Sequence, residues 1–224
     1  MFKRIKSGIT GLDPLIEGGF IEGSVNLVTG GTGTGKTTFS TQFLWDGLQR
    51  GESCIYITLE EGPDAIKQDA SLFGWDFEKY EKKGLCKFIY HDPVQVNNIG
   101  SVIIDEISNI KAKRVVIDSL AVIGLVIGEP AQIRRRLMNI INTLKHSGCT
   151  SIVISEIPDG SNALSRFDVE EFTVDSVILL NYLGIGGLDA RSVVVRKMRG
   201  TNHGKDVYPF EITQKGIVVK KPEL

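Results

Sequence analysis

The feature that most constrains this chain is the run GGTGTGKT, residues 30–37, which follows an apolar stretch and opens an amphipathic one. In the order strand, glycine-rich loop and helix, this GxxxxGK[ST] pattern is typical of a phosphate-binding loop. The glycines permit a tight turn whose amides point inward, and the start of the helix favours an anion. A glycine-rich turn that binds nothing is the alternative, which the full match in this context disfavours. We expect phosphate contacts from Gly30, Gly31, Thr32, Gly33, Thr34, Gly35, Lys36, Thr37 and Thr38.

Three polar residues complete the predicted phosphate site. Lys36 would place its charge at the β and γ phosphates, and the Thr37 hydroxyl would bind Mg²⁺. Asp118 ends the apolar run at residues 114–120, where a Walker B carboxylate would hold the same ion. A strand-terminal Asp is otherwise often a helix cap, but the glycine loop favours the metal role.

Paired acids, Glu60 and Glu61, follow another apolar run at residues 54–59. Open parallel sheets bind ligands at the carboxyl ends of their strands, so these side chains are expected near the glycine loop. A carboxylate there can orient and deprotonate a water molecule. The alternative is a pair of solvated acids that stabilise the start of the next helix.

Short β-branched runs alternate with helical patterns, which predicts an α/β fold with a mostly parallel sheet and helices on both faces. The length of 224 residues favours one domain, residues 1–224. The strands are expected at 24–30, 54–59, 86–90, 114–120 and 150–157, and the helices at 36–50, 63–73, 97–109 and around 133–144. After a loop at 157–172, strand-like runs separated by short turns predict an antiparallel C-terminal hairpin extension.

The net charge of −1 provides no global field toward DNA or an anionic membrane, so any DNA binding is expected to be weak. The basic run at residues 134–136 is predicted to be a solvated helix face, with a subunit interface or nucleic acid as alternatives. Three dispersed cysteines suggest neither a disulfide framework nor a zinc site. Without a signal peptide or an apolar run long enough to span a bilayer, we expect a soluble cytoplasmic protein with no membrane partner.

The segment KMRGTNHGK, residues 197–205, gathers four potential cations around one turn. Strand alternation puts Lys197 and Arg199 on one face. With His203 and Lys205 they could clamp a phosphate from an element separate from the glycine loop. A solvated basic hairpin is the alternative.

Together these motifs resemble the KaiC-like branch of the RecA superfamily of P-loop ATPases, over nearly the whole chain. SGITGLDPLIEGGFIEGSVNLVTGGTGTGKTTFSTQFL is similar to the family's lead into Walker A, YITLEE to its strand ending in paired glutamates, and VVIDS to its Walker B strand. DVEEFTVDSVILL resembles the segment before its last core strand. The most specific match is KMRGTNHGKDVYPFEIT, which is similar to a K-x-R-G-T-x-H-x-K turn followed by YPF.

The resemblance implies a RecA-like fold that binds ATP with Mg²⁺ and hydrolyses it slowly in a regulatory or signalling role. It implies Glu60 as the base, with Glu61 beside it. It also implies a homohexameric ring in which Lys197, Arg199 and His203 reach the nucleotide of the neighbouring subunit. KaiC carries two such domains in tandem, so its two-domain clock mechanism does not transfer to the one domain expected here.

Three alternatives remain open. A RadA-like recombinase paralogue would assist DNA repair, but recombinases usually have a glutamine near the strand end where this chain has Glu156, and they add an N-terminal domain. The loop at 157–172 offers only Arg166 and Phe167 as candidate DNA contacts. A second alternative is a scaffold that binds ATP without hydrolysing it. The resemblance also permits autophosphorylation near this loop, which nothing local supports, at Ser161, Ser165 or Thr173.

Overall fold

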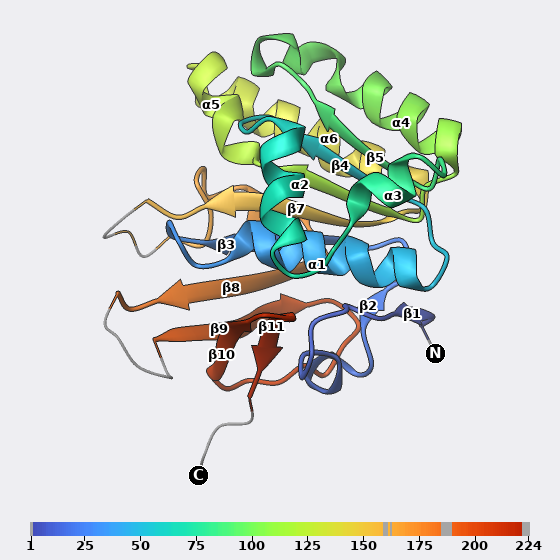
Figure 1. Ribbon diagram of the computed structural model, residues 1–224. Coiled ribbons are helices and arrows are strands. Elements are labelled where there is room, and N and C mark those ends of the chain that lie inside the picture. The colour runs from blue at the N-terminus through green and yellow to red at the C-terminus, as the bar shows by residue number, and fades with distance from the viewer. Residues whose placement is uncertain (1, 159–160, 162, 185–189, 221–224) are drawn as a thin grey trace.

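A nine-stranded sheet forms the centre of the molecule in the computed structural model, which describes residues 2–158, 161, 163–184 and 190–220 (Figure 1). The strand order is β11-β10-β9-β8-β3-β7-β6-β4-β5. The strands are β3 (Val25–Gly30), β4 (Cys54–Thr58), β5 (Cys86–Tyr90), β6 (Arg114–Asp118), β7 (Thr150–Glu156), β8 (Ser176–Tyr182), β9 (Arg191–Met198), β10 (Tyr208–Thr213) and β11 (Gly216–Val219). The six from β8 to β5 are parallel and the last three are antiparallel, which confirms the predicted α/β class and RecA-like fold.

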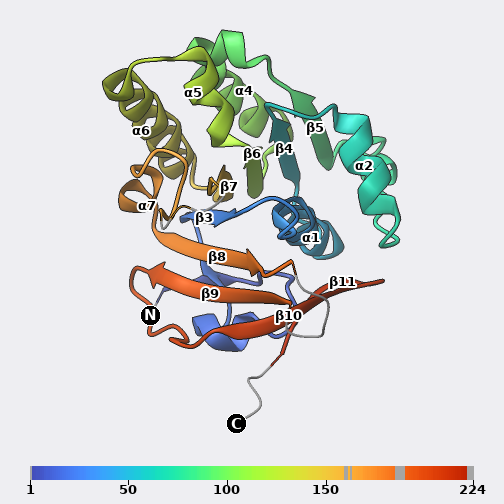
Figure 2. The ribbon, with the colours of Figure 1, turned by 90° about the vertical axis from the view of Figure 1, so that its left-hand side faces the viewer.

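Helices cover both faces of this sheet. Figure 2 shows α1 and α2 on one face and α4 and α6 on the other. The α-helices are α1 (Lys36–Gln49), α2 (Pro63–Ser71), α3 (Phe77–Glu81), α4 (Ile99–Ile110), α5 (Ile123–Val126), α6 (Pro130–Ser147) and α7 (Glu170–Thr173). Shorter 3₁₀ turns are η1 (Asp13–Ile16), η2 (Pro93–Asn98) and η3 (Leu120–Val122). The four long helices match the expected ranges, whereas α3, α5 and α7 are too short to leave a periodic pattern.

Two hydrophobic cores lie on opposite faces of the sheet. Alternation along β4 places Tyr56 in the core beneath α1, while Ile55 and Ile57 belong to the core beneath α4 and α6. Because both faces are buried, the central strands are continuous apolar runs. Free thiols of Cys54, Cys86 and Cys149 are buried in these layers.

The C-terminal extension begins one strand later than the sequence pattern suggests. The first of the C-terminal runs, β8, pairs in parallel with β3, and the antiparallel extension starts at β9. The turn expected between β8 and β9 lies partly outside the described residues, at 185–189. The expected loop at 157–172 likewise includes residues 159, 160 and 162, which are outside the described chain.

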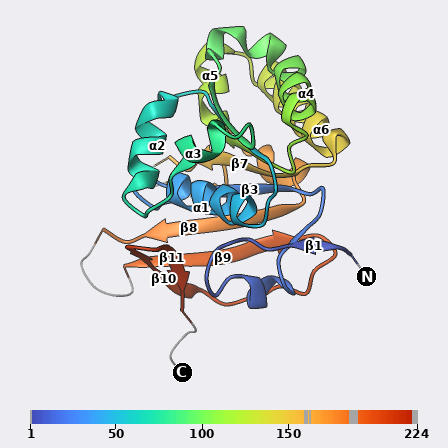
Figure 3. The same cartoon turned by 45° about the vertical axis from the view of Figure 1, so that its right-hand side comes forward.

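The N-terminal segment and strand β11 both contact α1. The N-terminal segment forms a two-stranded ladder of β1 (Arg4–Ile5) with β2 (Phe20–Ile21) and lies beside the extension in Figure 3. The Gln42 amide on α1 donates to the carbonyls of Gly8 and Ile217, at 2.9 and 3.2 Å, and accepts from the Ile217 amide at 2.6 Å. The helix after the glycine loop is thus fixed by the first and last parts of the described chain. No helix among the described residues is long and apolar enough to cross a bilayer.

Candidate nucleotide-binding site

The glycine loop lies between the end of β3 and the start of α1, as its pattern predicts. Gly35 adopts φ +96° at the helix N-cap, a conformation that strains residues with a Cβ. At Gly30, a Cβ would lie 2.2 Å from the Leu180 carbonyl oxygen. The Lys36 ammonium folds back over the loop and donates to the carbonyls of Gly30 and Gly31, at 3.1 and 2.9 Å. Burial lowers the pKa of Lys36, against the opposing effect of nearby carboxylates.

A carboxylate and a hydroxyl lie together beside the loop. Thr37 Oγ1 donates to Asp118 Oδ2 over 3.3 Å, and the Tyr56 hydroxyl donates to the same oxygen. Burial raises the pKa of Asp118, while hydrogen bonds from Tyr56 and Thr37 and the charge of Lys36 oppose that shift. Hard oxygen donors of this kind suit Mg²⁺, which usually takes one or two protein ligands and completes its shell with phosphate and water. Among the described residues, no group of three or more His, Cys, Asp or Glu side chains is arranged to hold a metal ion.

Tyr56 is a site residue that the sequence reasoning missed. Its only sequence signal is a hydroxyl-bearing ring within an otherwise apolar buried strand, since a buried tyrosine hydroxyl usually needs a partner. Its position on β4 is directly opposite Val116 of β6, two residues before Asp118. The tyrosine therefore orients the predicted metal ligand from a neighbouring strand.

The paired acids follow β4 at the same edge of the sheet. The Thr58 hydroxyl accepts from the amides of Glu60 and Glu61, at 3.3 and 3.1 Å, and donates to the Glu61 carbonyl at 2.8 Å. Both glutamates are exposed and line the cleft beside the glycine loop. The pKa of Glu60 is raised, first by partial burial and then by the charges of Glu156 and Asp118. A raised pKa suits a residue that must take a proton near neutrality.

Glu156 joins the site from the end of β7. Its Oε1 lies 3.8 Å from Lys36 Nζ, although the sequence marked this residue only as a departure from recombinases. A cleft of about 380 Å³ connects these groups. It is lined by Thr32, Gly33, Gly35, Lys36, Thr37, Thr38, Thr58, Glu60, Glu61, Asp118, Glu156 and Ile212.

The basic turn lies at the opposite end of the sheet. The Arg199 amide donates to the Asp175 carbonyl, and the Asp175 amide donates to the carbonyl of Val25, the first residue of β3. The glycine loop follows Gly30, five residues further along that strand, which corresponds to about 16 Å. Lys197, Arg199, His203 and Lys205 do not line the cleft of their own chain. One chain therefore does not bring the two predicted halves of the site together.

The N-terminal segment holds this turn in place. The Arg4 guanidinium donates to the carbonyls of Ile16, Gly19 and Gly200, and to the Thr201 hydroxyl at 3.0 Å. The arginine thus ties the residues after β9 to the loop around η1. The backbone of the turn is therefore fixed, while Arg199 and Lys205 remain exposed.

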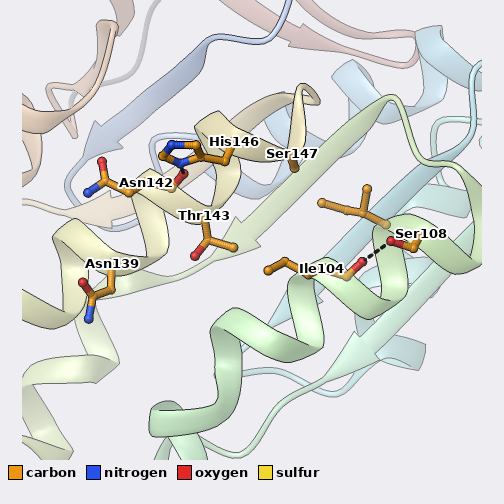
Figure 4. Close-up of a pocket in the computed structure, with 8 residues that line it drawn as sticks. Ile104, Ser108, Asn139, Asn142, Thr143, His146 and Ser147 are labelled. Carbon is orange, nitrogen blue, oxygen red and sulfur yellow. Dashed lines mark hydrogen bonds between the residues drawn. The ribbon is translucent and has the colours of Figure 1, made fainter.

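A second cavity, of about 540 Å³, lies between α4 and α6 (Figure 4). The cavity is lined by isoleucine side chains, hydroxyls, amides and one imidazole. The lining residues are Ile104, Ile107, Ser108, Asn139, Asn142, Thr143, His146 and Ser147. None of these lining residues is a lysine, an arginine or a carboxylate. The cavity therefore lacks the charge that a polyphosphate needs, unlike the cleft at the glycine loop.

The remaining candidate residues have separate environments. On α6, Arg134 and Arg135 are exposed while Ile133 and Leu137 are buried, as the pattern predicts. Arg166 is also exposed. Ser165 is fully buried with its hydroxyl between two carboxylates, which leaves it poorly placed to accept a phosphoryl group.

Comparisons with known proteins agree with this geometry. The family model "ATPase: KaiC" matches residues 5–224. A UPF0273 protein of Pyrococcus furiosus is 42% identical, over 98% of this chain and 94% of its own length. The circadian clock protein KaiC3 of Synechocystis is 33% identical over 97% of this chain but only 45% of its own length. A crystal structure of a KaiC-like protein from Pyrococcus horikoshii superposes with a TM-score of 0.90, at 43% identity, over 99% of this chain and 100% of that one.

Proposed function

Because this chain belongs to the KaiC family of ATPases, we propose that it binds ATP with Mg²⁺ and hydrolyses it slowly at the cleft beside the glycine loop. The observation that carries the proposal is the convergence of three groups on one cleft. The Lys36 ammonium, the Thr37–Asp118 pair and the Glu60 carboxylate reach it from α1, β6 and the end of β4.

Each of these groups has a separate role. The amides of the loop and the Lys36 ammonium bind the β and γ phosphates. Thr37 and Asp118 would hold Mg²⁺, whose charge would offset the negative charge of the phosphates. Glu60 orients the attacking water and accepts its proton, with Glu61 beside it as the alternative base. Tyr56 keeps Asp118 turned toward Thr37.

We further propose that the site is completed by a neighbouring copy in a homohexameric ring. Lys197, Arg199 and His203 lie at the end of the sheet away from their own cleft. The geometry therefore favours contact between these residues and the nucleotide of another subunit. A cation supplied from a second chain can stabilise the charge on a transferring phosphoryl group. Lys205 belongs to the same turn and adds positive charge there.

A regulatory or signalling role in the cytoplasm completes the proposal. The cytoplasmic location is supported by the three cysteines, which are free and buried, as expected in a reducing compartment. We propose one domain over residues 1–224, in keeping with the one nine-stranded sheet that runs through the described chain. DNA is at most a weak partner in this proposal, since the chain carries a net charge of −1.

The test measures ATP binding, ATP hydrolysis and oligomer mass on the wild-type protein and on Lys36→Ala. We expect hydrolysis and a ring mass for the wild type, and loss of ATP binding for the variant, because the loop amides then face a polyanion without their main charge. Lys113 is exposed and directly precedes β6, at the end of that strand away from the cleft. Lys113→Ala is therefore the matched control and should bind ATP normally.

Three results would change the assignment. Unchanged affinity of Lys36→Ala for a non-hydrolysable ATP analogue would remove the phosphate-loop assignment. Binding without turnover in the wild type would favour the scaffold alternative. Hydrolysis stimulated by single-stranded DNA, together with tight DNA binding at physiological salt, would favour the recombinase paralogue.

A further inference from the structure

A buried carboxylate outside the cleft, Glu170, has no role in the chemistry described above. It is 0% exposed, at the start of the short helix α7. Its Oε1 accepts from Ser155 Oγ at 2.9 Å, and its Oε2 lies 2.7 Å from Ser165 Oγ. The amides of Phe167 and Val169 also donate to Oε2, each at 3.3 Å. Ser155 and two amides thus donate to this buried acid, and the one Ser165 proton is shared between it and Glu171 Oε2, an arrangement that is costly to disturb.

Ser155 provides a rigid attachment for this acid. It belongs to β7, whose residues pair with β3 through to the Gly30–Glu156 pair and with β6 as far as Val153 on the other side. A strand paired on both sides keeps its place when one side-chain hydrogen bond is lost. The Ser155–Glu170 hydrogen bond therefore anchors α7 to the sheet, and the position of the strand does not depend on this bond.

The backbone of α7 and the residue after it in turn hold the cations of the basic turn. Lys197 Nζ donates to the carbonyls of Glu171 and Val174, at 2.8 and 2.9 Å. The Arg199 guanidinium donates to the Phe172 carbonyl at 3.3 Å. All three carbonyls come from a stretch of four residues that begins directly after Glu170.

Charge crowding makes these carbonyl contacts important. The pKa of Lys197 is lowered by burial and by the positive charges of Arg199 and Lys145, partly offset by Asp175. Lys145 lies 3.0 Å from Asp175 Oδ1, closer than the 3.7 Å that separates Arg199 from the same oxygen. Since Lys145 lies closer to this carboxylate, the side chains of Lys197 and Arg199 rely mainly on the carbonyls around α7.

We infer that Glu170 is a positioning residue for the cations that each subunit donates to the nucleotide site of its neighbour. Through its bonds to Ser155 and the 165–169 segment it anchors α7, and through the α7 carbonyls it sets where Lys197 and Arg199 lie. The inference rests on the proposed shared site. A displacement of about 1 Å in such a group can cost on the order of 10²-fold in rate.

The test uses mixed rings with two kinds of subunit. Donor subunits carry Lys36→Ala, which removes their own nucleotide site but leaves their basic turn intact. Recipient subunits carry Arg199→Ala, which keeps their own cleft intact but removes their own donated arginine. If sites are shared, ATP hydrolysis recovered on mixing comes from recipient clefts that face a donor.

Glu170→Gln is then added to one kind of subunit at a time. In the donors we expect the recovered turnover to fall about tenfold or more, because the amide group cannot accept from all the donors around the carboxylate and α7 shifts. In the recipients we expect a change of less than about twofold, since their basic turn already lacks Arg199 and β7 stays paired. A purely structural role for Glu170 would lower turnover equally in both arrangements.

Three outcomes decide the matter. Loss confined to the donors supports the inference, and equal loss, or no loss, overturns it. Absence of any recovery in the starting mixture, with mixed rings shown by mass, overturns the shared site itself and the inference with it. If Glu170→Gln does not fold, Ser155→Ala replaces it, because that change removes one donor and leaves the amides of Phe167 and Val169. It should produce a smaller loss, again in the donors alone.

Discussion

Glu156 Oε1 lies 3.8 Å from Lys36 Nζ, and the charge of the same carboxylate raises the pKa of Glu60. One acid at the end of β7 therefore acts on both the phosphate-binding cation and the proposed base. The expected pH dependence of hydrolysis follows from this relationship.

Glu156→Gln should shift the acid limb of the ATPase pH profile to lower pH. Glu60 must be ionised to accept a proton, so turnover is lost as the pH falls through its raised pKa. Removal of a nearby negative charge lowers that pKa, and ionised Glu60 then persists to lower pH. The profile of kcat against pH measures the shift. A limb that stays in place or moves to higher pH would contradict the assignment of Glu60 as the base.

Glu60→Gln should keep ATP bound while turnover falls on the order of 10²–10⁴-fold, since the amide keeps the shape of the side chain but cannot accept a proton. Glu61→Gln is the matched control, because Glu61 shares the Thr58 turn. Single-turnover kinetics with binding measured in parallel separates the two effects. An inactive Glu61→Gln beside an active Glu60→Gln would reverse the assignment within the pair.

Arg199→Ala should be nearly inactive, because an arginine supplied to a phosphoryl-transfer site is worth roughly 10³–10⁵ in rate. Mixed with Glu60→Gln subunits under conditions that allow reassembly, it should regain part of its activity. Each inactive variant keeps the group that the other lacks, so an interface between them can hold a complete site. Stable mixed rings that stay inactive at every ratio would show that the two groups do not meet across subunits.

Gly47→Ala should lower the free energy of unfolding, although alanine usually stabilises a helix by about 0.5–1 kcal/mol over glycine. The added Cβ would lie 2.5 Å from Arg114 Nε. Arg114 is 0% exposed and is fixed by ion pairs to Glu52 and Asp46, at 2.6 and 3.1 Å, so it cannot easily move away. Overpacking of this kind costs about 1–3 kcal/mol.

Gly100→Ala in α4 is the matched control for this change. Its added Cβ would meet Thr143 Oγ1 at 3.5 Å, an ordinary contact. It should follow the usual helix preference and leave stability unchanged or raised. Denaturant unfolding of both variants decides the matter, and equal stabilisation by the two changes would contradict the packing argument.

Local patterns were sufficient to predict the first half of the site. The loop from Gly30 to Thr37 requires glycine where the backbone is tight, and Asp118 ends a run that only a doubly buried strand explains. Those constraints act within a few residues, so the sequence displays them. The long helices and the parallel strands were predictable for the same reason.

Contacts between distant segments could not be predicted in this way. Tyr56 reaches Asp118 from a neighbouring strand, and Glu156 meets Lys36 across 120 residues of sequence, so neither pairing leaves a local pattern. The very short α7 has no periodicity of its own, yet it holds the cations of the basic turn. The residue types suggested a function at these positions. Which side chains meet, however, depends on the order of the strands in the sheet.

The position of β3 in the sheet has a consequence for biosynthesis. This strand leaves the ribosome well before its two neighbours, β7 and β8, which begin at Thr150 and Ser176. Until those strands have been made, both edges of β3, and the glycine loop attached to it, lack their final partners. Non-local pairing of this kind delays folding until late segments arrive. The glycine loop thus gains its final surroundings only after β8 and the hairpin of β10 and β11, which Gln42 contacts, have been made.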